Sequence, residues 1–402
     1  MCRFIVYKGA EPIQLAHLVT RPRHSIINQA FESKLRLPST RPLNADGFGI
    51  GWYDPQDAPA PGMPGKLADV SDSPSPAGSR TPGDLIDNAK ADGEGKEAGK
   101  DEGKMNGNEE DLAAALEIVR RRQKEVELEN ERPCVFKSLS PAWSNANLIR
   151  LAEKIRSPLI FAHVRATTSA GAPSEENCHP WIFDRLMWMH NGEISQFQKI
   201  KRALQFSLPE ELFLFPSGGT DSEWAFMVFL SKLKNPHARS FTHVELRDAM
   251  LETLKHINKL LQEAGVTTPS LLNYVVSDGE TVVAIRYVTS RTCEAASLFF
   301  SSGTSFDEYA EGMYRMTKAD KRENLIMIAS EPLTFERSDW MEVKSNTMLV
   351  ITPKMNILQI PIIDEYWVPP QDPNAHHRSK DFAISMGFGY GFAPPDAPII
   401  TA

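Results

Sequence analysis

The stretch CRFIVYKG (residues 2–9) follows Met1 directly and predicts a strand over Cys2–Tyr7 that begins with a cysteine. Removal of Met1, which is favoured by a small second residue, leaves a thiol and a free α-amine on Cys2. An α-amine has an unperturbed pKa of roughly 7.7–8.0 and a thiol about 8.5, so the amine can activate the thiol as a nucleophile. Cysteine also occurs at this position by chance, and the position alone does not separate the two explanations. The hypothesis of an N-terminal nucleophile therefore depends on four further motifs.

The composition excludes several classes of protein. The 402 residues include 52 Asp and Glu against 44 Lys and Arg, a formal charge of −8 that argues against a nucleic-acid-binding protein. The four cysteines show no CxxC or Cys/His spacing, so neither a metal site nor a disulfide framework is indicated. No apolar run approaches the roughly 20 residues of a membrane span, and the N-terminus does not resemble a signal peptide. We therefore expect a cytoplasmic protein with no membrane association.

The chain changes character twice. No Phe, Tyr or Trp occurs between Asp54 and Val135, where Pro, Gly, Ser and charged residues dominate. This composition predicts a disordered insertion at 55–131, with a solvated or partly docked helix over about 109–130. Strand-like segments at 47–54 and 134–143 stand on both sides, so we expect one domain over 2–368 that is interrupted by this insertion. The remaining residues, 369–402, are predicted to form a mobile tail.

The rest of the chain predicts strands, then a helical block, then strands again. The capping-box patterns Thr220–Glu223 and Thr242–Glu245 predict the starts of two helices, and Asp278-Gly279 predicts a hairpin turn. A third predicted helix covers 195–206. The predicted strands are 2–7, 48–53, 159–165, 186–190, 271–277, 281–288, 296–301, 325–330, 348–352 and 357–362. This order indicates the α+β class with largely antiparallel sheets, and no βαβ repeat favours a doubly wound fold.

Two motifs combine a basic side chain with a strand end or a turn. In AHVRATT (162–168), Arg165 ends a strand, where its guanidinium suits capture of a carboxylate, and Thr167 and Thr168 offer hydroxyl donors. The alternative for Arg165 is an ordinary surface ion pair. In ENCHP (176–180), His179 precedes a proline in an extended or turn segment and either lines a site or bonds to the backbone.

Two glycine-containing motifs suggest complementary roles. In HNGEI (190–194), Asn-Gly favours a tight turn. It is therefore either only a turn, or a place where the Asn191 amide and the Gly192 N–H bind an oxyanion together. In GGTDSE (218–223), Asp221 either stabilises the start of a helix or binds a substrate ammonium group. Together the motifs describe a site that holds the α-carboxylate and α-amine of a glutamyl group and attacks its distal carbonyl.

The motifs Cys2, NADGFGI (44–50), AHVRATT, NCHP, HNGEI, TDSE and ASEPL (329–333), in this order, resemble the class II glutamine amidotransferases. The resemblance implies a four-layer αββα N-terminal-nucleophile (Ntn) hydrolase fold with two stacked antiparallel sheets. It implies Cys2 as nucleophile and Asn191 and Gly192 as the oxyanion hole. Arg165 with Thr168 would then hold the α-carboxylate, Asp221 the α-amine, and His179 would lie near the pocket. No cofactor and no metal are implied.

Longer stretches, among them CRFIVYKG, RPRHSIINQAFESKLRL (21–37), FKSLSPAWSNANL (136–148), ASEPLTFERSDW (329–340) and PIIDEY (361–366), resemble the fungal amidotransferase-type subunits of a cytosolic glutathione-degrading complex. This closer resemblance implies hydrolysis of the γ-glutamyl bond of glutathione together with a metallopeptidase-like partner subunit. One alternative is a glutaminase that supplies ammonia to a separate synthase. Another, from a different class, is a non-catalytic scaffold subunit. The chain itself shows no P-loop for activating an acceptor.

Overall fold

The computed structural model describes residues 2–35, 43–54, 117–122, 131–166, 174–319, 323–369 and 372. Contacts divide the chain into one unit of residues 1–55 and 130–402 and a second unit of residues 56–129. In the second unit the structure describes only the helical residues 117–122. The predicted insertion at 55–131 and tail at 369–402 thus lie almost wholly outside the described residues. The fold below is that of the first unit.

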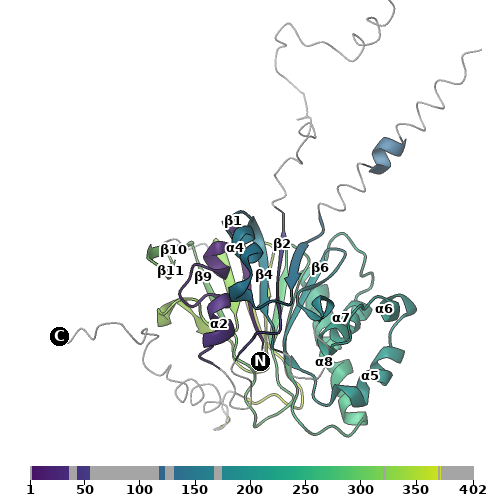
Figure 1. Ribbon diagram of the computed structural model, residues 1–402. Coiled ribbons are helices and arrows are strands. Elements are labelled where there is room, and N and C mark those ends of the chain that lie inside the picture. Colours follow the sequence, from purple (N-terminus) through teal and green to yellow (C-terminus); the bar gives the residue numbers. More distant parts are fainter. Residues whose placement is uncertain are drawn as a thin grey trace, which may run out of the picture. The chain divides into compact units, whose positions relative to one another are not determined.

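Strand β1, which follows Cys2, lies in the middle of a seven-stranded antiparallel sheet, here called sheet A (Figure 1). It pairs with β12 on one side and β4 on the other, and the register places Arg3 opposite Val164 and Ile5 opposite Ala329. The order across the sheet is β13 (Met341–Glu342), β9 (Phe299–Gly303), β12 (Leu325–Ala329), β1 (Arg3–Gln14), β4 (Arg156–Val164), β2 (Phe48–Tyr53) and β3 (Cys134–Ser138).

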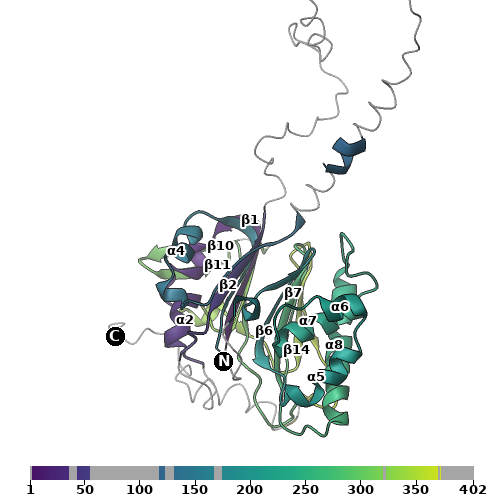
Figure 2. The ribbon, with the colours of Figure 1, turned by 45° about the vertical axis from the view of Figure 1, so that its right-hand side comes forward.

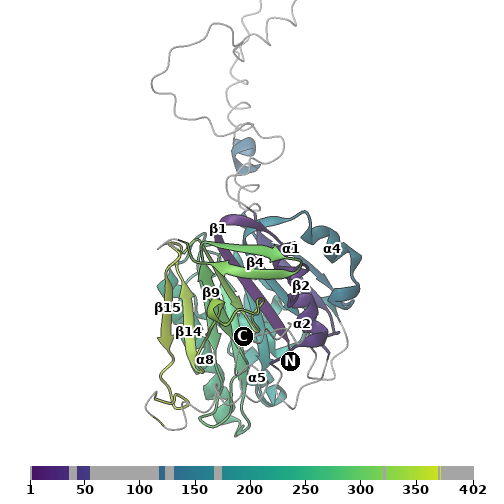
Figure 3. The ribbon, with the colours of Figure 1, turned by 90° about the vertical axis from the view of Figure 1, so that its left-hand side faces the viewer.

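A second antiparallel sheet, here called sheet B, has six strands. Figure 3 shows its edge strand β15 beside β14. The order across it is β15 (Ile357–Pro361), β14 (Thr347–Ile351), β8 (Val282–Arg286), β7 (Leu271–Ser277), β6 (Leu186–Glu193) and β5 (Trp181–Phe183). A separate hairpin is formed by β10 (Ser305–Ala310) and β11 (Met313–Thr317).

The two sheets stack face to face, and helices cover their outer faces (Figure 2). One apolar core lies between the sheets, a second lies under the helices of sheet A, and a third lies under those of sheet B. Sheet A is covered by α1 (Ala16–Val19), α2 (Ile26–Glu32) and α4 (Ala146–Ala152). Sheet B is covered by α5 (Phe197–Phe206), α6 (Glu210–Leu214), α7 (Asp221–Lys232) and α8 (His243–Glu263). The predicted α+β class with four αββα layers is confirmed.

Side chains of the central strands alternate between two buried faces. On β1, Phe4 and Val6 enter the core between the sheets, whereas Ile5 and Tyr7 enter the core under the helices of sheet A. Because successive side chains of a strand point to opposite faces, Cys2 shares the inner face with Phe4, and Arg3 shares the outer face with Ile5. The nucleophile candidate therefore faces sheet B.

Several local predictions were confirmed and others were wrong. The Thr242–Glu245 capping box forms with both of its hydrogen bonds. At Thr220 only half of the predicted box forms, since the Glu223 carboxylate accepts from Ser217 N and Gly218 N instead of reaching back to Thr220. The Asn191-Gly192 pair is not a turn but lies inside β6, paired with β7. The β10–β11 hairpin was not predicted.

Among the described residues, no helix has both the length and the apolar character needed to cross a bilayer.

We expect Gly49→Ala to destabilise the stacking of the sheets. A Cβ atom at Gly49 would lie 2.0 Å from the backbone oxygen of His179, so that backbone must move. Overpacking of this kind lowers the free energy of unfolding by about 1–3 kcal/mol. The measurement is urea unfolding. In the control variant Gly219→Ala the nearest atom lies 3.9 Å from the new Cβ, and equal losses in both variants would contradict the argument.

Candidate active site

The Cys2 thiol lies against the backbone that follows Arg165. Its Sγ accepts from Ala166 N at 3.4 Å and donates to Ala166 O at 3.5 Å. The side chain is 7% exposed. The antiparallel pairing of Arg3 with Val164 explains this contact, because it brings the residue before Arg3 beside the residues after Val164.

Arg165 is buried at the end of β4 and is held by the loop that precedes β2. Its backbone N donates to Gly47 O at 2.8 Å, and its Nη1 lies 3.4 Å from Asp46 O. The NADG segment and the strand end therefore fix one another next to Cys2. Thr168, the predicted companion of Arg165, lies outside the described residues.

Asn191 and Gly192 occupy neighbouring positions on β6, which faces sheet A. Met187 and Met189 of this strand enter the core between the sheets, so alternation directs Asn191 toward sheet A as well. Asn191 is fully buried, its Nδ2 donates to Ser330 Oγ at 3.1 Å, and its Oδ1 has no hydrogen-bond partner among the described residues. At Gly192 only glycine fits, since a Cβ would lie 1.8 Å from Leu271 O.

Asp221 opens α7 directly beside the end of β6. Its Oδ2 accepts from Ile194 N at 2.7 Å. The neighbouring Ser222 hydroxyl bonds to His190 Nδ1 at 2.8 Å, while His190 Nε2 donates to Leu271 O at 3.0 Å. Burial lowers the pKa of His190, although the Asp221 charge opposes that shift. His190 is thus a neutral ring that joins β6 to α7 and β7.

His179 stacks on His163, with ring centroids 3.8 Å apart. His163 Nε2 donates to His190 O at 3.1 Å and so joins β4 to β6. Burial lowers the pKa of His163 to about 3 and that of His179 well below its ordinary value, so both rings are neutral. Neither ring nitrogen of His179 has a partner in the part of the chain that the structure describes.

Cys178, which precedes His179, is fully buried. Burial raises the pKa of its thiol to about 11, which disfavours a thiolate and is consistent with a packing role.

Contacts therefore connect six of the seven predicted site residues at one end of the stacked sheets. Cys2 touches the residue after Arg165, the His179–His163 stack lies two residues before Arg165, and His163 bonds to the residue before Asn191. Asp221 contacts the segment that follows Gly192. The seventh residue, Thr168, lies outside the described residues. No group of three or more His, Cys, Asp or Glu within the described ranges is arranged to hold a metal ion.

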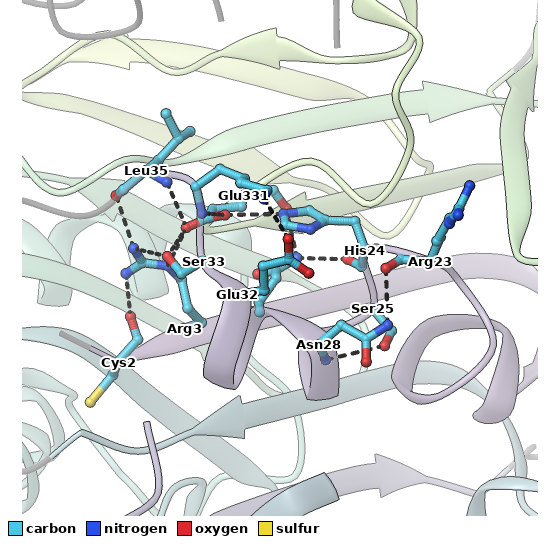
Figure 4. Close-up of polar contacts among 12 residues, drawn as sticks. Cys2, Arg3, Arg23, His24, Ser25, Asn28, Glu32, Ser33, Leu35 and Glu331 are labelled. Carbon is cyan, nitrogen blue, oxygen red and sulfur yellow. Dashed lines mark hydrogen bonds and ion pairs between the residues drawn. The ribbon is translucent and has the colours of Figure 1, made fainter. Parts of the chain in front are cut away.

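A buried ion pair that the motifs did not predict lies directly behind Cys2 (Figure 4). Arg3 Nε lies 2.7 Å from Glu331 Oε1, and both side chains are 0% exposed. Arg3 Nη1 donates to Cys2 O at 2.8 Å, and Nη2 donates to Leu35 O at 2.8 Å. In Figure 4 the Cys2 sulfur points away from this pair while its carbonyl points toward the guanidinium. The pair therefore fixes the backbone of Cys2 without occupying its thiol.

Glu331 accepts hydrogen bonds from several segments at once. Besides Arg3, these donors are His24 Nε2, the Ser33 hydroxyl, Lys34 N and Leu35 N. Burial alone would raise the pKa of this carboxyl, but the Arg3 charge and the His24 and Ser33 hydrogen bonds outweigh it and hold the pKa well below its usual range. Glu331 is therefore an ionised group at neutral pH. The motif ASEPL contained the only sequence signal for it.

Comparison with known proteins identifies the family. Residues 128–360 match the family described as glutamine amidotransferases class-II. A Saccharomyces cerevisiae protein, "Probable glutamine amidotransferase DUG3", is 42% identical over 397 residues, which cover 96% of this chain and 90% of that protein. This chain belongs to the class II glutamine amidotransferases. It is accordingly an enzyme of an amidohydrolase family, as the motifs predicted.

Other matches are more distant. A "Putative glutamine amidotransferase" of Haemophilus influenzae is 30% identical to this amidotransferase over 132 residues, 32% of this chain and 39% of that protein. A solved class-II domain protein from Silicibacter pomeroyi has a TM-score of 0.48 at 19% identity, covering 90% of this chain and 100% of its own. The glutamine phosphoribosylpyrophosphate amidotransferase of B. subtilis has a TM-score of 0.45 at 12% identity, covering 90% and 49%.

We expect Glu331→Gln to lower the free energy of unfolding by about 3–5 kcal/mol, because it leaves the buried Arg3 charge without this carboxylate. Urea unfolding measures the loss. The control is Glu153→Gln, which breaks an ion pair with Arg21 whose side chains are 39% and 36% exposed. Such an exposed pair contributes about 0–1 kcal/mol. Similar losses in both variants would contradict the assignment.

The stabilisation that Glu331 contributes should also depend on pH. The folded pKa of Glu331 lies below the unfolded value of about 4.3, so its stabilising contribution is present above that value and is lost as the pH falls below it. Glutamine does not titrate. The difference in unfolding free energy between wild type and Glu331→Gln should therefore stay constant above about pH 5 and narrow as the pH falls below about 4. A difference that stays constant down to about pH 3 would contradict the ionised state.

Proposed function

We propose that this amidotransferase hydrolyses the γ-glutamyl bond of glutathione to glutamate and Cys-Gly, with Cys2 as the nucleophile. The observation that carries the proposal is the Cys2 thiol against Ala166, beside the buried Arg165 and on the face of sheet A that is turned toward Asn191. Two contacts support it: the thiol touches the residue after Arg165, and the Ser330 hydroxyl accepts from both Phe4 N, two residues after Cys2, and the Asn191 amide.

In the proposed complex each charged group of the glutamyl moiety has a partner. Arg165, together with Thr168, binds the α-carboxylate, because a guanidinium matches the planar geometry of that group. Asp221 binds the α-ammonium group, and His179 lines the pocket as a neutral ring. The Asn191 amide and the Gly192 N–H receive the oxyanion that develops on the γ-carbonyl.

The reaction then proceeds in two steps. The free α-amine of Cys2 takes the thiol proton, and the sulfur attacks the γ-carbonyl carbon. The tetrahedral intermediate collapses, the C–N bond breaks, and the Cys2 ammonium returns the proton to the departing amine of Cys-Gly. Water, deprotonated by the same amine, next attacks the γ-glutamyl thioester. Glutamate leaves and the thiol is restored.

A glutaminase is the second candidate, and the family to which the chain belongs, the glutamine amidotransferases, favours it. Glutamine and glutathione share the glutamyl half that Arg165 and Asp221 would hold, and they differ only in the leaving group, which is ammonia for glutamine. Under this alternative the ammonia would pass to a separate synthase. A non-catalytic scaffold would lack both activities.

The proposal also concerns organisation and partners. Residues 2–368 are taken as one catalytic domain interrupted at 55–131, because β2 and β3 on either side of the interruption pair in sheet A, with Trp52 opposite Cys134. We place 369–402 outside this domain. The protein is proposed to act in the cytoplasm, which suits its four free cysteines, with a metallopeptidase-like subunit as partner.

The choice between substrates is tested with the full chain, alone and with the metallopeptidase-like subunit. Glutathione and glutamine are supplied separately, and Cys-Gly, ammonia and glutamate are measured. Release of Cys-Gly supports the proposal. Ammonia from glutamine without cleavage of glutathione favours the glutaminase, and release of no product from either substrate contradicts both.

Cys2→Ala should abolish glutamate release, because it removes the thiol that is proposed to attack the γ-carbonyl. Asn191→Ala should lower kcat by about 100- to 1000-fold with a smaller change in KM, as expected for an oxyanion donor. Cys293→Ser, at an exposed thiol, serves as the matched control and should retain wild-type activity. Persistent turnover in Cys2→Ala would exclude the mechanism.

A further inference from the structure

We propose that Ser330 is a positioning residue that holds the Asn191 amide in register with the strand that carries Cys2. The inference rests on the proposed function, since it concerns how the oxyanion donor reaches its place. Ser330 is fully buried directly after β12, and it is not one of the residues that are proposed to contact the substrate. Its hydroxyl connects the start of β1 in sheet A to Asn191 in sheet B.

The Ser330 hydroxyl accepts two hydrogen bonds from opposite directions. Phe4 N in sheet A donates to it at 3.0 Å, and Asn191 Nδ2 in sheet B donates to it at 3.1 Å. Ser330 N in turn donates to Phe4 O at 2.9 Å, so the serine itself is fixed on β1. One oxygen thus connects the backbone two residues after Cys2 to the Asn191 side chain.

This bond orients the amide for its proposed task. A primary amide has two N–H groups, and the bond to Ser330 uses one of them, which leaves the second for an oxyanion. The Asn191 Oδ1 has no partner among the described residues, so no hydrogen bond to that oxygen fixes the amide plane. Because all three residues are fully buried, bulk water does not replace the serine. Loss of the hydroxyl would let the amide rotate about χ2.

Alternation along β12 separates this contact from the ion pair beside it. Ile326 and Ile328 enter the core between the sheets, which places Ser330 on that inner face and Glu331 on the outer face. Glu331 indeed bonds to Arg3, His24 and the segment 33–35. A substitution at Ser330 therefore removes the contact with Asn191 while the carboxylate and its partners remain.

The test is a double-mutant cycle on the full chain, with glutamate release measured on the substrate that the wild type cleaves. Ser330→Ala should lower kcat about 10- to 100-fold with KM changed by less than about threefold, because a misplaced donor costs transition-state stabilisation. In the Asn191→Ala background the same substitution should lower kcat by no more than about threefold, since there is no amide left to position.

Ser157→Ala is the matched control for loss of a buried serine. The Ser157 hydroxyl is also fully buried and accepts from a backbone N–H, that of Leu159 at 3.1 Å, but it lies at the start of β4, away from Cys2. This variant should keep kcat within about threefold of wild type. The rate at which iodoacetamide alkylates Cys2 should be similar in wild type, Ser330→Ala and Ser157→Ala, which shows that the thiol is still in place.

The outcomes separate the two proposals. An equal loss from Ser330→Ala in both backgrounds, or a loss matched by Ser157→Ala, indicates a purely structural serine and overturns the positioning role. Full activity of Ser330→Ala overturns it as well. An Asn191→Ala variant as active as wild type contradicts the proposed oxyanion hole itself, and with it the proposed function, whatever Ser330→Ala does.

Discussion

The site depends on one constraint, which is that the central strands of sheet A are buried on both faces. A strand sends successive side chains to opposite sides, so neighbouring residues on β1 and β12 must serve different layers. Cys2 and Ser330 face sheet B, whereas Arg3 and Glu331 face the helices. The reacting group and the groups that hold its backbone are therefore adjacent in sequence but lie on separate sides of the sheet.

This separation explains how an ionic network can stand so close to a reactive thiol. Moving two charges out of water is costly, and the cost is offset here by a short contact and by hydrogen bonds to both oxygens of the carboxylate. Those bonds come from Arg3, His24 and the segment 33–35, so Glu331 ties the start of the chain to the region after α2. On the other face, Ser330 ties the same strand to Asn191. The first residues of the chain are thus fixed from both sides.

The features that the sequence predicted correctly are those that depend on residues close together in the chain. The alternation of predicted strands and helices gave the α+β class, and the Thr242–Glu245 pattern located the start of α8. The motifs around Cys2, Arg165, His179, Asn191 and Asp221 identified residues that the fold does bring into one connected set. The roles given to these residues remain proposals. Each of those motifs is short and contains a reactive or charged side chain, so the motif can be recognised without knowing the fold.

What the sequence did not predict depends on contacts between distant residues. Asn191-Gly192 has the local preference of a turn, but pairing with β7 and the close approach of Leu271 O hold it in an extended strand. The hairpin β10–β11 was missed because four of the six residues of β10 are exposed and two of these are acidic, which hides the alternation of a strand. Glu331 and Ser330 have partners more than 100 residues away, so no spacing in the sequence could indicate them.

The most direct test of the central claim is mass spectrometry of the enzyme quenched in acid during turnover of a γ-glutamyl substrate. The account predicts that the N-terminal peptide begins with Cys2, without Met1, and carries one glutamyl group as a thioester on that cysteine. A glutamyl group on any other residue, or a chain that turns over substrate while it retains Met1, would contradict it.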